Sequence, residues 1–259
     1  MTQAPEQSHA VTPTEAELRR ELAAVYRLVA HYQMTDLIFT HISARLPDAD
    51  GEPRFLINPY GLLFEEITAS SLVVVNLEGE IVEPTPYAVN PAGFVIHSAI
   101  HAARPDAHSV LHTHTKAGCA VAATEEGLLP VNQMSLEFYG RVGYHDYEGI
   151  ALNKDEQVRL VANLGDHPAL ILRNHGLLTV GETPMKAFTR MYYLNKACEI
   201  QVAAMSAGSL LLPSPEVCEY TAGQFTGEST VDYADEVGSD LLGKAMMRLV
   251  ERIAPDYAD

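Results

Sequence analysis

The chain has 259 residues, of which 47% are hydrophobic and 20% charged, enough to bury one conventional globular core. Its 34 acidic residues outnumber its 17 basic residues, for a formal net charge of -17. Nucleic acids and anionic membranes are bound through clustered Lys and Arg, so we expect neither as a partner.

The N-terminal part predicts a helix followed by short paired strands. Residues 1–13 are polar and contain proline, so we expect a flexible lead-in. Thr14 and Glu17 form a capping-box pattern, and apolar residues at helical spacing then predict a helix to about residue 33. Three β-rich runs follow and indicate strands: FLIN at 55–58, LVVVN at 72–76 and EIVE at 80–83.

From Asn90 onward, predicted helices and strands alternate. The pattern first predicts a helix from Pro91 that ends before Pro105, and then a strand at 109–115. A second helix begins at Asn153 or Asp155 and ends at Gly165, and strands at 169–172 and 177–180 follow around a turn at 174–176. A long helix then runs from Thr183 to Gly208. Residues 209–259 are rich in Gly, Ser, Pro and acidic residues, and we expect a C-terminal extension with one short helix near 238–253.

Two histidines, His112 and His114, lie one residue apart at the end of an apolar run. In a strand they point to the same face with Cα atoms about 6.6 Å apart, which suits two ligands of one metal ion. His175 is the candidate third ligand, since it lies in a tight turn where Gly176 frees the backbone. Three neutral imidazoles suit zinc, iron or another late divalent ion and leave a coordination position open. The pair alone also fits two hydrogen-bonded histidines at a strand end.

Other histidines compete for a role. His97 and His101 are four residues apart on a predicted helix and share a face. No carboxylate or third histidine lies near them at a familiar ligand spacing, so a face of satisfied polar groups is the better interpretation. His41, in FTHISAR, follows a short apolar run and is either a structural turn residue or a wall of the site.

The sequence lacks the features of an exported or membrane-inserted protein. Its start has no basic segment followed by an apolar stretch, and no run of about 18 apolar residues occurs. The cysteines Cys119, Cys198 and Cys218 are widely spaced, without CxxC or Cys/His ligand spacing. We expect a soluble, cytoplasmic protein with reduced thiols.

Several segments together resemble the class II aldolase/adducin family, in particular its adducin-like bacterial branch: NPAGFVIHSAIHAARPDAHSVLHTHTKAG, YHDYEGI and LILRNHGLLTVGET. The resemblance runs from about residue 15 to 208 and sets the expected family domain at 14–208. It implies a three-layer α/β/α fold with a central mixed, mostly antiparallel sheet. It also implies a homotetramer with active sites between subunits, and a divalent ion bound by His112, His114 and His175, with zinc expected first and manganese or iron as alternatives.

The sequence departs from the sugar-phosphate aldolases of this family at residues that handle phosphate and the proton. In those enzymes a Ser-Ser-Glu segment precedes the helix histidine that corresponds to His97, whereas this chain has Pro91, Ala92 and Gly93 there. Pro59-Tyr60-Gly61 replaces a phosphate-contacting PTG or PSG turn, and His41 replaces the asparagine of a GNxS turn. We therefore do not expect a phosphorylated sugar as substrate.

These features predict a divalent-metal-dependent carbon-carbon lyase that acts on an unphosphorylated hydroxy-carbonyl or hydroxy-carboxylate by retro-aldol cleavage or decarboxylation. With the family's glutamate absent, another group must move the proton, and the candidates are His41, then Glu137 and Tyr139, then His97. Glu137 also fits an ion-pair partner of Arg141, and Tyr139 also fits a subunit-interface residue. Two other functions remain open: a non-catalytic adducin-like binding or scaffold protein, and a non-haem iron oxygenase.

Overall fold

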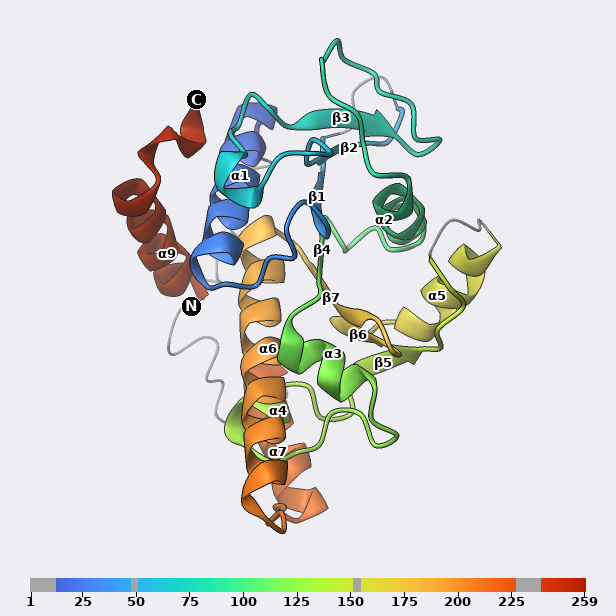
Figure 1. The fold of residues 1–259 in the computed structure, drawn as a ribbon, viewed down its shortest axis with the longest axis vertical. Coiled ribbons are helices and arrows are strands. Elements are labelled where there is room, and N and C mark those ends of the chain that lie inside the picture. Colours follow the sequence, from blue (N-terminus) through green and yellow to red (C-terminus); the bar gives the residue numbers. More distant parts are fainter. Residues whose placement is uncertain (1–12, 48–50, 151–154, 227–238) are drawn as a thin grey trace, which may run out of the picture.

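The computed structural model describes residues 13–47, 51–150, 155–226 and 239–259, so nearly all of the expected lead-in lies outside the described residues. Within these ranges one seven-stranded sheet has the strand order β3-β2-β1-β4-β7-β6-β5 (Figure 1). The strands are β1 (His41–Arg45), β2 (Arg54–Ile57), β3 (Val73–Asn76), β4 (Ser109–Thr113), β5 (Val142–His145), β6 (Ala169–Leu172) and β7 (Gly176–Gly181). Only β5 and β6 pair in parallel, so the predicted mixed, mostly antiparallel sheet is confirmed.

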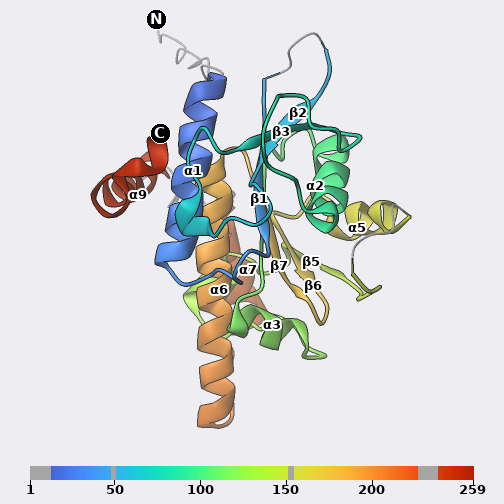
Figure 2. The same cartoon turned by 45° about the horizontal axis from the view of Figure 1, so that its top comes forward.

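Helices cover both faces of the sheet, which confirms the predicted three-layer α/β/α arrangement (Figure 2). Helices α1 (Glu15–His31) and α6 (Pro184–Ala207) cover one face, and α2 (Pro91–Ala103) and α5 (Glu156–Leu164) cover the other. Alternate residues of β4 enter different cores: Leu111 lies in the core that α1 and α6 cover, whereas Val110 lies in the α2 and α5 core. Because residues two apart share a face, even-numbered His112 also lies on the α2 side.

The helix termini follow the predicted capping signals. The Thr14 hydroxyl accepts a hydrogen bond from the Glu17 N–H at 3.3 Å, and the Glu17 carboxylate accepts one from the Thr14 N–H at 2.8 Å, so the capping box is present. Thr183 caps α6 by accepting from the Lys186 N–H, ahead of proline in the first turn. Local sequence therefore sets where these long helices begin.

Two strand predictions differ from the structure. The run EIVE at 80–83 forms no strand, because Ile81 makes only an isolated bridge to Val75 after the turn. The strand predicted at 109–115 ends at Thr113, since the Thr115 hydroxyl caps an unpredicted helix, α3 (Lys116–Ala122). His114 consequently lies one residue beyond β4.

The C-terminal residues contain more helix than the sequence predicts. Helix α9 (Ser239–Ile253) confirms the expected short helix, but α7 (Pro215–Thr226) lies where we predicted irregular chain, and it packs on α4 (Gln133–Leu136). Arg27 of α1 donates to Asp256 at 2.8 Å, and Val250 and Tyr257 are buried, so α9 and the residues after it pack on α1. None of the helices in the described ranges combines the length and apolarity needed to cross a bilayer.

A buried tyrosine of α1 completes the hydrogen bonding of β1. Strand β2 pairs only with residues 43–45 of β1, which leaves the backbone of Ile42 without a strand partner on that side. The Tyr26 hydroxyl accepts from the Ile42 N–H at 2.8 Å and lies 2.5 Å from the Ile42 carbonyl oxygen. Tyr26 thus replaces the missing strand partner next to His41.

We expect Tyr26→Phe to lower the free energy of unfolding by about 1–3 kcal/mol, because it leaves buried backbone groups of Ile42 unsatisfied. Urea unfolding measures this loss. Tyr220→Phe is the matched control, since Tyr220 lies on α7 with 55% of its surface exposed, and its effect should stay within about 0.5 kcal/mol. Equal unfolding free energies for the two variants would contradict the role assigned to Tyr26.

Candidate metal centre

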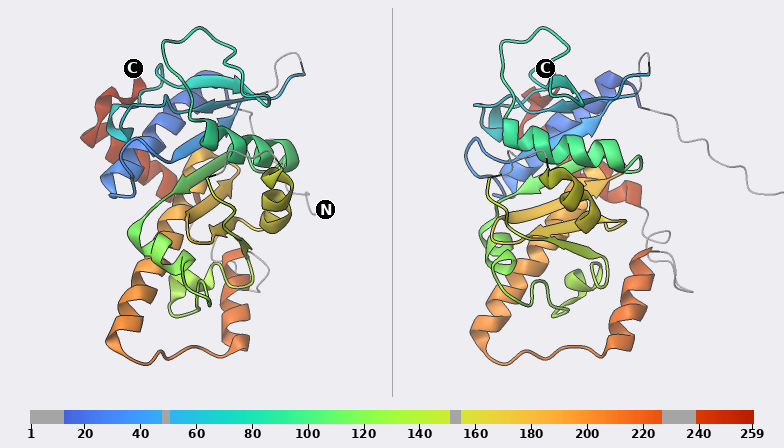
Figure 3. Two further views of the ribbon diagram at one scale, coloured as in Figure 1. Left: turned by 45° about the vertical axis from the view of Figure 1, so that its right-hand side comes forward. Right: turned by 90° about the vertical axis from the view of Figure 1, so that its right-hand side faces the viewer.

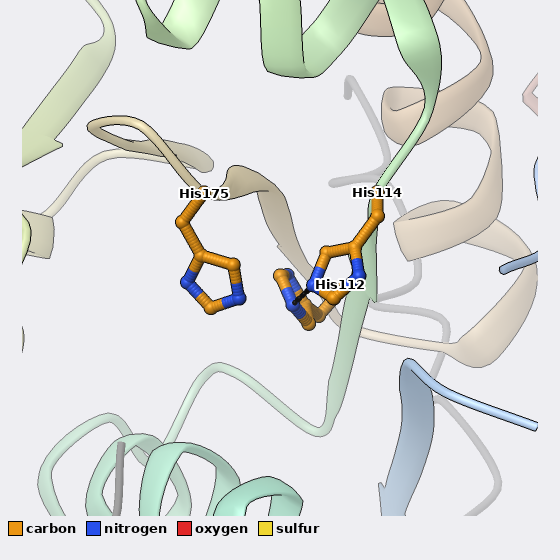
Figure 4. A group of neighbouring side chains, drawn as sticks. All are labelled: His112, His114 and His175. Carbon is orange, nitrogen blue, oxygen red and sulfur yellow. Dashed lines mark hydrogen bonds between the residues drawn. The ribbon is translucent and has the colours of Figure 1, made fainter. Parts of the chain in front are cut away.

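Three histidines converge where β4 ends (Figure 4). His112 belongs to β4, His114 follows its last residue, and His175 comes from the turn between β6 and β7. Their ligand nitrogens all lie within 4.8 Å of one another. His112 is buried, whereas His114 and His175 are partly exposed. The structure therefore brings together the three predicted ligands at a place that a small molecule can reach.

A close backbone approach positions His175. A Cβ added at Gly176 would lie 2.4 Å from the Thr113 carbonyl oxygen, so only glycine lets this turn pack against β4. Asn174 adopts the left-handed conformation with φ of 56°, and its N–H donates to Ala122 at 3.1 Å. The sequence Asn-His-Gly thus places the imidazole of His175 beside the pair on β4.

The hydrogen bonds of His112 and His114 fit a bound cation. His112 Nδ1 lies 2.9 Å from the carbonyl oxygen of Leu177, and His114 Nδ1 lies 2.9 Å from Oδ2 of Asp36. Both partners only accept, so each Nδ1 carries the hydrogen and each Nε2 has an unshared pair. These two Nε2 atoms are 2.9 Å apart. Two unshared pairs repel at this distance, and one ion bonded to both at about 2.0–2.1 Å removes the repulsion.

Burial favours the neutral forms of His112 and His175, and metal ligation requires neutral imidazoles. Burial lowers the pKa of His112 well below its ordinary value, and the nearby His175 and His41 lower it further. Burial, with His114 and His145 nearby, lowers the pKa of His175 to about 4. The three side chains fit zinc or another divalent ion that accepts nitrogen ligands.

His41 lies beside this centre on β1, directly opposite His112 in the strand register. Its ring is 5.2 Å from the ring of His112 and 4% exposed. The imidazole also lies against the first turn of α2. A Cβ added at Gly93 would lie 2.5 Å from Cδ2 and 2.9 Å from Nε2 of His41. The ring of His41 therefore needs a residue without a side chain at position 93.

The other predicted acid or base candidates lie farther from the three histidines. His97 is fully buried behind His41, with 2.7 Å between His97 Nε2 and His41 Nδ1. Glu137 lines a groove of about 1250 Å³ whose walls come from α4, α6, α7 and α9 and include none of the three histidines. Burial raises the pKa of Glu137, and Lys186 and Arg190 oppose this shift. Among the described residues, neither Glu137 nor Tyr139 hydrogen-bonds to the three histidines, so their chemical roles stay predictions.

Three residues near the centre were not singled out from the sequence. Asp36 orients His114, the Cys119 thiol donates to the carbonyl oxygen of His175 at 3.0 Å, and the ring of Tyr147 lies 6.4 Å from that of His175. Cys119 follows His114 by five residues, which is a weak sequence signal. Asp36 gives none, because 78 residues separate it from His114.

Comparisons with known proteins agree with this architecture. The family model for the class II aldolase and adducin N-terminal domain matches residues 20–202. The crystal structure of an aldolase II superfamily protein from Pseudomonas syringae is 50% identical, with a TM-score of 0.87 over 96% of this chain and 98% of that chain. L-fuculose 1-phosphate aldolase from Glaciozyma antarctica PI12 is 28% identical, with a TM-score of 0.81 over 98% of this chain and 96% of that chain.

Alpha-adducin from Rattus norvegicus is also similar, with 48% identity over 196 residues, which is 74% of this chain and 26% of the adducin. The matched residues 20–202 contain the whole sheet and all three histidines. With this sequence, fold and set of relatives, the chain belongs to the class II aldolase and adducin family, as the sequence motifs predicted.

Proposed function

We propose that the protein is a divalent-metal-dependent lyase that breaks a carbon-carbon bond of an unphosphorylated hydroxy-carbonyl or hydroxy-carboxylate substrate. The carrying observation is the pair of facing Nε2 atoms of His112 and His114, 2.9 Å apart, with both Nδ1 hydrogens already committed to acceptors. One structural neighbour is an L-fuculose 1-phosphate aldolase. Zinc is the proposed ion, with manganese or iron as alternatives.

Residues of this chain can bind the ion, move the proton and orient a ligand, which are the three tasks that the proposed reaction requires. His112, His114 and His175 would hold a divalent ion, which would act as a Lewis acid toward a substrate oxygen. His41 accepts the proton of the substrate hydroxyl as that oxygen becomes a carbonyl, while the electrons of the breaking bond move toward the substrate's acceptor group. The proton then returns to the carbon that received them. Asp36 holds the ring of His114 in place throughout.

The preference for an unphosphorylated substrate rests on missing hydroxyl groups. In the sugar-phosphate aldolases that this sequence resembles, serine and threonine side chains contact the phosphate. Here Pro91 begins α2, and the turn at 59–61 presents Tyr60, whose N–H donates to the Ala88 carbonyl at 2.8 Å. Neither segment offers the small hydroxyl side chains of the phosphate sites.

We also propose a homotetramer with sites between subunits, in a reducing cytoplasm. The end of α6, the following loop and α7 extend beyond the sheet (Figure 3). They expose apolar side chains that a second copy would cover: Val202, Met205, Leu211, Leu212, Val217 and Tyr220. Helix α7 packs on α4, and the expected interface residue Tyr139 follows α4 closely in the sequence. The three cysteines are free thiols, as a reducing compartment requires.

A binding or scaffold function is the second candidate. Its support is the 48% identity to alpha-adducin, which exceeds the 28% identity to the L-fuculose 1-phosphate aldolase. The two candidates differ in a direct assay of metal-loaded protein with unphosphorylated hydroxy-keto acids. Metal-dependent release of a carbonyl product supports the lyase. Absence of turnover, with no metal retained, supports the scaffold. Bound iron with oxygen uptake supports the oxygenase.

Metal binding tests the centre itself. We expect protein purified without chelators to hold one divalent ion per chain and His112→Ala and His175→Ala to lose it, because each removes a ligand. Asp36→Asn should weaken binding about 10–100-fold, because it removes the carboxylate that accepts from His114 Nδ1 and orients that ring. Elemental analysis and competition with a chromogenic chelator measure both effects. His31→Ala, on the exposed end of α1, is the control, and full occupancy in both ligand variants would refute the site.

If His41 transfers the proton, replacing it should change the rate of turnover and leave metal binding intact. We expect His41→Asn to keep the metal ion and lower kcat roughly 10²–10⁴-fold, because it removes the group that takes the hydroxyl proton. Steady-state kinetics with the best unphosphorylated hydroxy-keto acid, together with metal analysis, checks this. Unchanged kcat would assign the proton to another residue.

The contact between His41 and Gly93 predicts energetic coupling that needs no substrate. We expect Gly93→Ala to lower the free energy of unfolding by about 1–3 kcal/mol through overpacking. In a His41→Ala background the same change should cost little, so the coupling energy is about 1–3 kcal/mol. Gly243→Ala is the control, since its Cβ would meet only Met185 at 3.4 Å. Additive effects in urea unfolding would show that His41 does not occupy this space.

A further inference from the structure

A hydrogen-bonded chain of buried polar side chains connects the backbone carbonyl of Ala107 to the imidazole of His41. His101 Nδ1 lies 3.2 Å from the Ala107 carbonyl oxygen, and His101 Nε2 lies 2.7 Å from Ser43 Oγ. Ser43 Oγ lies 2.5 Å from His97 Nδ1, and His97 Nε2 lies 2.7 Å from His41 Nδ1. Each of these four residues has at most 4% of its surface exposed to solvent. These hydrogen-bonded side chains are therefore shielded from bulk solvent.

The fold produces this chain by matching two spacings. His41 and Ser43 are two residues apart on β1 and share the face toward α2, about 6.6 Å apart along the strand. His97 and His101 are four residues apart on α2, about 6 Å along its axis. Helix α2 packs on the face of the sheet to which His41 and Ser43 point, so imidazoles from the helix alternate with side chains from the strand.

The direction of every hydrogen in the chain follows from its fixed end. Burial lowers the pKa of His101 to about 3 and lowers those of His97 and His41 well below ordinary values, so each ring carries one hydrogen. The Ala107 carbonyl only accepts, so the hydrogen of His101 is on Nδ1 and its Nε2 accepts from Ser43. The one hydroxyl hydrogen of Ser43 is then committed, and Ser43 must accept from His97 Nδ1. His97 Nε2 in turn accepts from His41 Nδ1.

We propose that Ser43, His97 and His101 are positioning residues that hold His41 as its Nδ1–H tautomer, which leaves the Nε2 atom of His41 as the acceptor for a substrate hydroxyl. The inference rests on the proposed lyase function and specifies how this chain replaces the family's glutamate. The ring of His41 lies 5.2 Å from that of His112 but is not among the nitrogens that cluster within 4.8 Å. Its Nε2 therefore serves the substrate and leaves the metal ion to the three ligands.

Substitutions that remove different hydrogen bonds of this series should give different tautomers of His41, which makes the inference testable. In His101→Phe the Ser43 hydroxyl can donate only to His97 Nδ1, so His97 must donate from Nε2 to His41 Nδ1, and the hydrogen of His41 moves to Nε2. Phenylalanine suits that position, because the His101 ring already lies 4.9 Å from the ring of Phe55. In Ser43→Ala the direction is no longer fixed, and His41 should show a mixture of both tautomers.

The measurement is long-range ¹H–¹⁵N NMR of the full chain with ¹⁵N-labelled histidine, metal-free and zinc-loaded, with His41 assigned from His41→Asn. We expect His41 to be the Nδ1–H form in the native chain, the Nε2–H form in His101→Phe and a mixture in Ser43→Ala. Ser109→Ala is the matched control. Ser109 is fully buried on the adjacent strand, and its hydroxyl donates to the Ser43 backbone carbonyl at 2.8 Å, so it is not one of the hydrogen-bonded side chains that lead to His41. It should leave His41 unchanged.

A native His41 with its hydrogen on Nε2, or a His101→Phe variant that keeps the Nδ1–H form, overturns the inference. Either His101→Phe or Ser43→Ala suffices if the other does not fold. In metal-loaded enzyme, Ser43→Ala should lower kcat about tenfold with KM within about twofold, the size of one lost hydrogen bond. The tautomer readout does not use turnover, so a native Nδ1–H His41 in a protein without lyase activity refutes the proposed function alone.

Discussion

The antiparallel register of β1 and β4, which places His41 opposite His112, is the constraint on which the candidate site depends. A slip of one residue would turn His41 and Ser43 toward α1 and α6, away from both the three clustered histidines and α2. Several interactions oppose such a slip. Ile42 is buried on the α1 side, and Tyr26 satisfies its backbone where β2 ends. The packing of an apolar residue on one face therefore fixes the polar residues on the other.

One hydrogen-bonding pattern orients the imidazoles of His112, His114 and His41. His112 and His114 commit Nδ1 to a carbonyl oxygen and a carboxylate, and His41 commits Nδ1 to His97. Each is left with an unshared pair on Nε2, because each partner can only accept at that contact. Neutral histidines are well suited to this use, because each ring has one donor and one acceptor. The metal centre and the proposed proton acceptor are thus two outcomes of one hydrogen-bonding pattern.

The sequence predicted the parts of this arrangement that local spacing determines. The HxH pair, the turn at His175, the capped helices and the order of the central elements all follow from patterns within about 20 residues. The contacts that give the site its chemistry join distant segments, such as Asp36 with His114 and Ser43 with His97, and depend on a strand register that spacing does not encode. The strand predicted at 80–83 was wrong because this segment meets β3 only at an isolated bridge, and β-branched composition does not set how far such pairing extends. Helix α7 was missed because the Gly, Ser, Pro and acidic residues of the region 209–259 indicated irregular chain, although Cys218 and Ala222 of this helix are buried.

The glycine at position 93, where the sugar-phosphate aldolases that this sequence resembles have a glutamate, also bears on the kind of substrate that the proposed centre suits. A carboxylate beside the ion would cancel part of its charge, whereas burial lowers the pKa values of His41, His112 and His175 and favours their neutral forms. The carboxylate that contacts a ligand is Asp36, which acts through His114. The ion would therefore keep most of its positive charge for the substrate, and an anionic oxygen would bind it more strongly than a neutral hydroxyl. With the phosphate-contacting hydroxyls absent, the negative charge of the substrate is best placed at the metal, as in a hydroxy-carboxylate or an enolate.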